Sequence, residues 1–291
     1  MTPESLAAEV SSLFTLPELA LRACAVMDAP AATAHDLIEV IELDANLAAR
    51  VLRLANSALY GQRGRVDTLS QAIALIGHKA VRDLVLATSA ARAFHDIPAE
   101  FVDMDTFWDN STTCAVFARL TAHYLRMRDA ETLFLAGLLH SVGRLVFYAR
   151  RPAEYREVLR LTQDEGLDLN AGERKVFGFD HSALGAALLQ GWQLPERLHT
   201  AVRCQLDPTA APADYARDVA VVHLAAAQAS NIAPCLKTRQ EPTQFIPDSA
   251  ALRSMQWLEL TPAALQEIRL ETLAASLEVI EIINPGTSII Y

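Results

Sequence analysis

Apolar residues recur along most of the chain at the three- to four-residue spacing of an α-helix. Between residues 37 and 59 this spacing is carried by Leu37, Ile38, Ile41, Leu47, Val51, Leu54 and Leu59. Thr33 with Asp36, and then Asp44, stand where the N-caps of two helices are expected. No run of Val and Ile alternates with polar residues, so the sequence predicts no strand and an all-α fold.

The most apolar segment runs from Leu133 to Val146 and is apolar over most of a helix circumference. Such a helix belongs in a core. Asp129 is expected to cap its start, and the segment Arg150–Pro152 is expected to end it. His140 and Ser141 lie in the middle, where a purely structural helix would not need polar side chains.

Further helices are expected on both sides of this segment. One opens at Leu16, and Gly61–Gly64 forms a turn before the next. Asp180 is expected to cap a helix that starts at His181, and Thr261 with Pro262 to start an amphipathic helix that reaches about Ile283. Residues 236–256 contain Pro, Lys, Arg, Gln and Asp, and are predicted to form a long loop.

Composition narrows the class of protein. Apolar residues make up 52% of 291 residues, which is enough for a sizeable core. The net charge of −10 argues against nucleic acid as a partner, since phosphate binding needs clustered Lys and Arg. None of the four cysteines forms a Cys-x-x-Cys pair, which is typical of buried thiols in a reducing compartment.

The expected location is the cytoplasm. The amino-terminal residues have no basic region followed by an apolar run, so no signal peptide is expected. No apolar run approaches the roughly 20 residues that a bilayer requires, so no membrane association is expected.

Two blocks of the chain resemble a known family. Leu-Leu-His-Ser-Val-Gly-Arg-Leu at 138–145 resembles the Leu-Leu-His-Asp-Ile-Gly-Lys-Leu helix of the HD phosphohydrolases, with Ser141 in place of the aspartate. Asn-Ser-Ala-Leu-Tyr-Gly at 56–61 resembles the amino-terminal signature of their HDOD relatives (HD-related output domain), although Ala45 replaces the family's usual proline. The resemblance covers roughly residues 12–230.

The resemblance implies an HD-domain-like multi-helix bundle with an amino-terminal helical subdomain. We expect residues 1–100 to form the amino-terminal helical part of the HDOD domain and residues 101–235 the HD-like helical core. Residues 236–291 are expected to be a loop followed by a helix that packs on the body.

HD phosphohydrolases hold one or two metal ions, which activate a water to attack a phosphate. The positions that match the family's metal ligands are Asn110, His140, Ser141, His181, Cys204 with Gln205, and Ala226. Two histidines remain and no carboxylate does, whereas such a site needs at least three protein ligands. We therefore expect no metal, no cofactor and no catalytic residue. His140 and His181 are then hydrogen-bonded core residues or vestigial-cleft contacts, and a zinc site of these two with Cys204 stays open.

The resulting hypothesis is a non-catalytic bacterial signalling module of the HDOD type. It would act by binding an unidentified signalling protein in trans, or a small ligand such as a nucleotide, in or beside the relic cleft. The alternatives are a diverged HD-type phosphohydrolase or cyclic-dinucleotide phosphodiesterase, and a cleft that binds nucleotide without hydrolysis. Both a monomer and a homodimer are compatible with the sequence.

Asn56 and Ser57 interrupt an apolar helix and have two interpretations. They either satisfy backbone groups at a helix end or contact a ligand or partner. We favour the first.

Overall fold

The computed structural model describes residues 1–11, 22–23, 25–26, 33–60, 66–94, 97, 100–238 and 242–285. Every regular element in these residues is a helix, so the all-α prediction is confirmed. The helix predicted to open at Leu16, the turn at Gly61–Gly64 and Cys24 lie outside the described residues.

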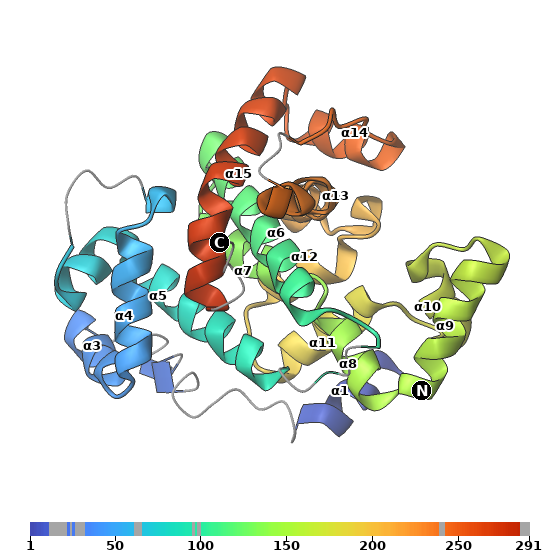
Figure 1. Cartoon of the computed structure of the whole chain (residues 1–291), viewed down its shortest axis with the longest axis horizontal. Coiled ribbons are helices and arrows are strands. Elements are labelled where there is room, and N and C mark those ends of the chain that lie inside the picture. The colour runs from blue at the N-terminus through green and yellow to red at the C-terminus, as the bar shows by residue number, and fades with distance from the viewer. Residues whose placement is uncertain are drawn as a thin grey trace.

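The chain order of the helices is shown in Figure 1. The longer helices are α1 (Pro3–Ser11), α3 (Ala34–Glu42), α4 (Ala45–Ala55), α5 (Leu69–Ala93), α6 (Met104–Tyr124), α7 (Ala130–Leu139), α8 (Val142–Arg150), α9 (Pro152–Glu165), α10 (Leu169–Phe177), α11 (His181–Gly191), α12 (Glu196–Cys204), α13 (Ala216–Thr238), α14 (Ser249–Trp257) and α15 (Pro262–Ile283). Short 3-10 turns are η1 (Ala58–Tyr60), η2 (Pro208–Ala210) and η3 (Ala213–Tyr215).

Helices α6, α7 and α13 form the centre of the molecule, and α15 lies along α6. Helices α3, α4 and α5 gather on one side, and the α9–α10 pair stands on the other (Figure 1). Helix α1 packs on α8 and α11, away from α3–α5, and α15 also contacts α4 and α5. The expected division into residues 1–100, 101–235 and 236–291 stays a prediction.

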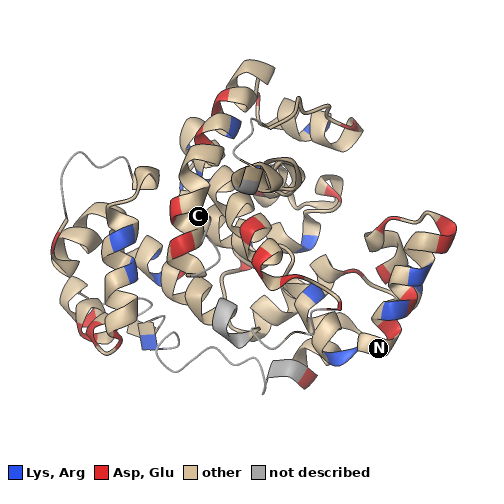
Figure 2. Cartoon of the chain, viewed as in Figure 1, with Lys and Arg blue, Asp and Glu red and all other residues tan. Residues whose placement is uncertain are grey.

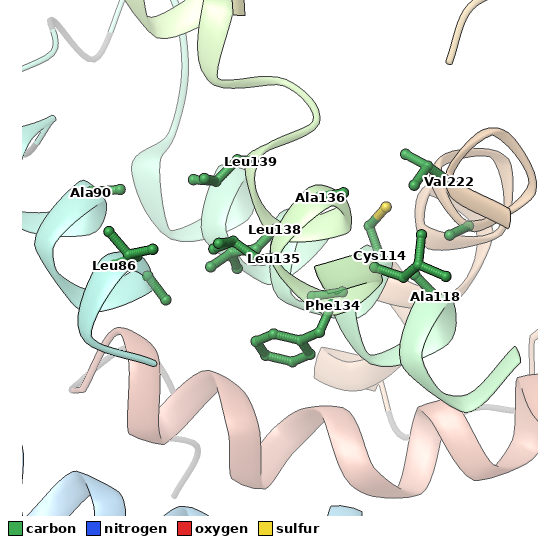
Figure 3. Packing of buried hydrophobic residues seen from close by; sticks show 14 of the residues in the cluster. Leu86, Ala90, Cys114, Ala118, Phe134, Leu135, Ala136, Leu138, Leu139 and Val222 are labelled. Atoms are coloured by element: carbon green, nitrogen blue, oxygen red, sulfur yellow. The ribbon is translucent and has the colours of Figure 1, made fainter. Parts of the chain in front are cut away.

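Helix α7 is the buried centre of the core. Figure 3 shows its apolar side chains between Leu86 and Ala90 of α5 on one side and Cys114 of α6 on the other. Gly137 lets α6 and α7 approach closely, because a Cβ at this position would lie 2.9 Å from the Cα of Ala115. A helix this apolar is buried all round, as its composition predicts.

The single helix predicted across His140 and Ser141 is wrong, because α7 ends at Leu139 and α8 begins at Val142. In a continuous helix the carbonyl of Gly137 would accept the N–H of Ser141. Here that carbonyl lies 2.7 Å from Nδ1 of the His140 ring. Ser141 takes φ −108° and ψ 8°, outside the helical region. The polar pair therefore interrupts the helix.

Most predicted N-caps are confirmed. Thr33 and Asp36 form a capping box, and Asp44, Asp180 and Thr261 each accept a backbone N–H of their own helix. Each cap depends only on residues within one turn, and for that reason the sequence identifies it.

The predicted cap at Asp129 is wrong. Asp129 has a left-handed backbone (φ 62°, ψ 43°), and its side chain makes no capping hydrogen bond. Its carboxylate instead pairs with Lys79 of α5 and with Arg197 of α12, at 2.9 Å from the latter. Asp129 thus links α5 and α12 at the start of α7.

The long loop predicted over residues 236–256 is also wrong in part. Helix α13 continues to Thr238 with Pro234 inside it, and α14 occupies Ser249–Trp257. Asp248 caps α14 by accepting the backbone N–H groups of Ala250 and Ala251. Only the intervening described residues, 242–248, are irregular.

Two stretches have the length and hydropathy of a membrane span, in contrast to the expectation from the sequence. They are Ala130–Arg150 and Ala213–Leu236, and 89% and 61% of their most apolar windows is buried inside the fold. The first is broken at His140 and Ser141. Both therefore have the environment of core helices.

Candidate functional site

His140 and His181 are the two histidines at positions that match the metal ligands of HD phosphohydrolases. Each lies at the end of a helix. His140 ends α7 and His181 begins α11, and their exposed fractions are 5% and 2%. Nδ1 of His140 is 2.7 Å from the carbonyl oxygen of Gly137, and Nδ1 of His181 is 2.8 Å from Oε2 of Glu173. Both rings are therefore fixed by hydrogen bonds at Nδ1.

Glu173 of α10 is the centre of this polar cluster, and the sequence analysis missed it. Its side chain is fully buried. Its Oε1 accepts from Nε of Arg144 at 3.2 Å and from the hydroxyl of Tyr155 at 2.9 Å. Its Oε2 accepts the backbone N–H of His181 at 2.8 Å in addition to the ring contact. Four donors thus saturate one carboxylate.

A pattern in α10 could have revealed Glu173. It lies four residues from Leu169 and from Phe177, on the same face of the helix. A glutamate on an otherwise apolar stripe is buried with its partners. Its partner Arg144 is 29 residues away, so the pairing itself depends on tertiary structure.

Two glycines bring the elements of the cluster together. A Cβ on Gly143 would lie 2.1 Å from the carbonyl oxygen of His181 and 2.7 Å from the nitrogen of Gly185. Helices α8 and α11 are therefore in direct backbone contact. This contact places Arg144, the next residue of α8, beside His181.

Burial and neighbouring charges together set the protonation state of each group in the cluster. Burial lowers the pKa of His140 to about 3, and the charges of His181 and Arg144 add to the shift. Burial and then Arg144 lower the pKa of His181 as well. Burial raises the pKa of Glu173, but its contacts with His181 and Arg144 outweigh that effect and lower it. At neutral pH the cluster holds two neutral imidazoles and one Arg–Glu ion pair.

Three further residues stand at positions that match the family's metal ligands: Asn110, Ser141 and Gln205. Asn110 is half-buried on α6, one turn before Cys114. Ser141 is buried, and its side chain makes no capping hydrogen bond. Nε2 of Gln205, at a position matched to a family histidine, donates to the carbonyl oxygen of His140.

Cys204 does not join the two histidines. Its Sγ lies 3.9 Å from the carbonyl oxygen of Ala210, on the wall of a cavity of about 620 Å³ that Arg174 and Arg203 also line. Within the described part of the chain, no group of three or more His, Cys, Asp and Glu side chains is arranged to hold a metal ion.

Asn56 and Ser57 lie elsewhere, at the end of α4. The Asn56 amide donates to the carbonyls of Leu52 and Val66 and accepts the N–H of Val66 at 2.8 Å. The Ser57 hydroxyl donates to the carbonyl of Leu54 at 2.7 Å. Both side chains thus satisfy backbone groups. They also line a cavity of about 690 Å³ between α4 and α15, so a ligand contact stays a prediction.

The next three residues attach α4 and η1 to the core. Glu278 of α15 accepts the N–H of Ala58 at 2.8 Å, and Arg119 of α6 donates to the carbonyl of Leu59 at 2.9 Å. The Tyr60 hydroxyl donates to Glu131 of α7 at 3.0 Å, and the Arg119 guanidinium lies 4.1 Å from the centre of the Tyr60 ring. The block that starts at Asn56 is thus a docking element.

Tyr60→Phe should weaken this docking. It removes one hydrogen bond to a charged, partly buried carboxylate, so we expect a loss of about 1.5 kcal/mol in the free energy of unfolding. Urea denaturation of the purified protein measures it. Tyr124→Phe is the matched control, because Tyr124 is 51% exposed and should tolerate the change. Equal stability of Tyr60→Phe and Tyr124→Phe would contradict the assigned role.

His140 should make the protein less stable in mild acid. Its folded pKa of about 3 lies below the ordinary histidine pKa of 6.5, so the unfolded chain takes up a proton that the folded chain does not. The contribution of neutral His140 to the free energy of unfolding is fully present above pH 6.5 and is lost as the pH falls. Between pH 7.5 and 5 it amounts to about 2 kcal/mol.

Urea denaturation at both pH values gives the difference in the free energy of unfolding between them. This difference should be smaller in His140→Gln than in the wild type. His35→Gln, at the exposed start of α3, is the control and should keep the wild-type difference. An unchanged difference in His140→Gln would show that His140 does not control the acid sensitivity.

Comparisons with known proteins find relatives of this fold. Residues 13–208 match the HDOD domain family. An uncharacterized protein of Treponema pallidum (strain Nichols) is 24% identical over 270 residues, a match that covers 90% of this chain and 50% of the relative. This chain therefore spans about half the length of that relative.

Solved structures extend the similarity over nearly the whole chain. A candidate phosphohydrolase from Shewanella amazonensis SB2B is 25% identical, with a TM-score of 0.74 and coverage of 96% of this chain and 97% of that one. An HDOD domain protein with unknown function from Geobacter sulfurreducens is 25% identical, with a TM-score of 0.67 and coverage of 96% and 92%. A candidate signal transduction protein from Marinobacter aquaeolei VT8 is 26% identical, with a TM-score of 0.66 and coverage of 93% and 59%.

Proposed function

Because this chain belongs to the HDOD domain family, we propose that it is a non-enzymatic bacterial signal-transduction module. It acts by binding a signalling protein in trans, or a small ligand, and its HD-type metal site is degenerate. The observation that carries the proposal is the set of donor atoms around His140 and His181.

Among the described residues at the matched positions, the donors left for a metal are two imidazole nitrogens and the side-chain oxygen of Gln205, which is buried without a hydrogen-bond partner. Each ring uses Nδ1 for an internal hydrogen bond, which leaves the two Nε2 atoms. The nearby carboxylate of Glu173 already accepts from Arg144, Tyr155 and His181, so it has no oxygen to offer. A transition-metal site needs at least three protein ligands. An amide oxygen is a poor third ligand beside two imidazoles, so this donor set does not fit one.

The charge of the cluster also disfavours a bound metal ion. The guanidinium of Arg144 contacts Glu173 and lowers the pKa of both histidines. A divalent cation at the same place would be repelled by this guanidinium and would lose its hydration shell. Ser141 supplies no negative charge to offset that cost, because it stands where HD phosphohydrolases have an aspartate.

A second candidate function is a diverged metal-dependent phosphohydrolase. A histidine that is fixed at Nδ1 by a carboxylate or carbonyl and keeps Nε2 for another partner is the usual arrangement in metal sites. His140 and His181 both have this arrangement. One similar structure is also described as a candidate phosphohydrolase.

A turnover assay separates the two functions. The full chain is incubated with bis(4-nitrophenyl) phosphate and with cyclic dinucleotides, in the presence of Mg²⁺, Mn²⁺ or Zn²⁺. We expect no turnover above that of the His140→Ala variant. Metal-dependent turnover that disappears in both His140→Ala and His181→Ala would replace the proposal by the hydrolase.

The proposed partner is a cytoplasmic protein. The net charge is −10, and Figure 2 shows Lys and Arg interspersed with Asp and Glu along the ribbons of the described helices. A surface of this kind does not suit a nucleic acid backbone. Nucleotide binding without hydrolysis is tested by a thermal-shift screen with cyclic dinucleotides. A monomer and a homodimer both fit the proposal.

A further inference from the structure

A second polar feature lies at α14 and α15, the helices that follow α13 in the chain. The irregular residues 242–248, α14 and the first half of α15 enclose a cavity of about 560 Å³. Its walls are mainly apolar and include Phe245, Leu252, Met255 and Leu265. Arg269 of α15 is the one charged residue among those that line it.

Arg269 is buried without a carboxylate. Its exposed fraction is 2%. It donates to Oδ1 of Asn231, to the carbonyl oxygen of Thr243 at 2.6 Å and to Oε1 of Gln266 at 3.3 Å. All three acceptors are neutral. Its Nε is buried and has no acceptor, and no ion pair joins it to any carboxylate of the described residues.

A buried charge without a counter-ion is unusual. Arginine is almost never fully buried unless it is paired, and a guanidinium keeps its proton in proteins. Burial lowers the pKa of Arg269, and only the thiol of Cys235 opposes this shift. The other buried arginine of the core, Arg119, has Glu131 as its counter-ion. Arg269 therefore has no counter-ion among the described residues. An anionic ligand bound in the cavity would supply one.

We propose that this cavity binds a carboxylate carried on an apolar body, with Arg269 as its counter-ion. The volume is within the range of about 300–1,000 Å³ that small-molecule sites occupy. Apolar walls with a single charged group suit a ligand with an apolar body and a single acid. The planar guanidinium is matched to a carboxylate in shape as well as charge.

The mouth of the cavity also favours an amphipathic ligand. Ile246, between two lining residues of the irregular segment, is 84% exposed, and Leu252 on the wall is 46% exposed. Both apolar side chains are thus exposed in the described part of the chain. The ligand is either a free organic acid or the carboxyl end of a peptide, which present the same chemistry. The proposed ligand site does not depend on the proposed function, since none of the residues that line this cavity belongs to the histidine cluster.

Calorimetric titration of the full chain tests the site. The probes are phenylacetate and octanoate, each beside its uncharged amide, and a short peptide that ends in Phe with a free or an amidated carboxyl group. We expect at least one acid to bind about tenfold or more tighter than its amide, because the charged hydrogen bond is lost in the amide. The probe that binds shows whether the ligand is a free organic acid or the carboxyl end of a peptide.

Variants connect binding to the cavity. Arg269→Gln should abolish the preference for the acid. Arg253→Gln, on the exposed face of α14, removes the same charge nearby and should keep it. Leu252→Trp should weaken binding by filling the cavity from its rim, and it tests the site even if Arg269→Gln does not fold.

Three results would overturn the proposal. The first is equal binding of acid and amide. The second is wild-type affinity in a folded Arg269→Gln or in Leu252→Trp. The third is no binding of any acid, free or peptide-borne, at millimolar concentration. None of them bears on whether the histidine cluster holds a metal.

Discussion

Replacing Gly143 by alanine should destabilise the protein by about 3 kcal/mol or more, or prevent folding, because the added methyl group has no room. Its Cβ would lie 2.1 Å from the carbonyl oxygen of His181 and 2.7 Å from the nitrogen of Gly185. Both are backbone atoms of α11, so no side chain can turn aside. Helices α8 and α11 would have to separate, which would pull Arg144 away from Glu173.

Gly191→Ala is the matched control. Gly191 is also helical, near the end of α11, but a Cβ there would meet nothing within 4 Å. Alanine is the better helix former, so this variant should be as stable as the wild type or slightly more stable. Thermal and urea denaturation of both variants measure the contrast. Equal stability of the two would show that α8 and α11 are not in backbone contact.

Replacing Glu173 by alanine should cost about 3–5 kcal/mol, the range found when one partner of a buried ion pair is removed. The Arg144 guanidinium would keep its charge without a counter-ion, and the hydroxyl of Tyr155 and the N–H groups of His181 would lose their acceptor. Tyr155 and His181 are buried, so solvent cannot replace the carboxylate there, whereas the Arg144 side chain is 24% exposed.

Glu157→Ala is the matched control, because it removes an ion pair that is exposed and not buried. Glu157 pairs with Arg160 on the outside of α9 at 2.7 Å, with about half of each side chain exposed. Surface pairs of this kind contribute about 0–1 kcal/mol. The free energy of unfolding, measured by urea denaturation, should therefore be much lower in Glu173→Ala than in Glu157→Ala. Similar losses in the two variants would show that Glu173 is not the centre of a buried cluster.

The sequence predicts the features of this fold that depend on neighbouring residues. Asp44 and Asp180 cap helices because an Asp lies just before an apolar-periodic stretch. The apolar spacing likewise predicts that α7 is buried. Asp248 follows the same rule for α14, but the polar composition of residues 236–256 concealed it.

The sequence does not predict the features that depend on tertiary contacts. At the break between α7 and α8, the ring of His140 lies against the carbonyl of Gly137, a contact that no propensity scale includes. Glu173 lies outside every family motif in the chain and reaches Arg144 and His181 only after α8, α10 and α11 have packed. No carboxylate stands at the positions that match the family's metal ligands, but the fold places the saturated carboxylate of Glu173 beside His181.

The central claim is that His140 and His181 do not form part of a metal centre. Elemental analysis tests it most directly, on protein purified without chelator from cells supplied with zinc, manganese and iron. The account predicts no stoichiometric metal, and the same trace content in the wild type and in a His140→Ala, His181→Ala double variant. One or two metal ions per chain in the wild type, lost in the double variant, would contradict it.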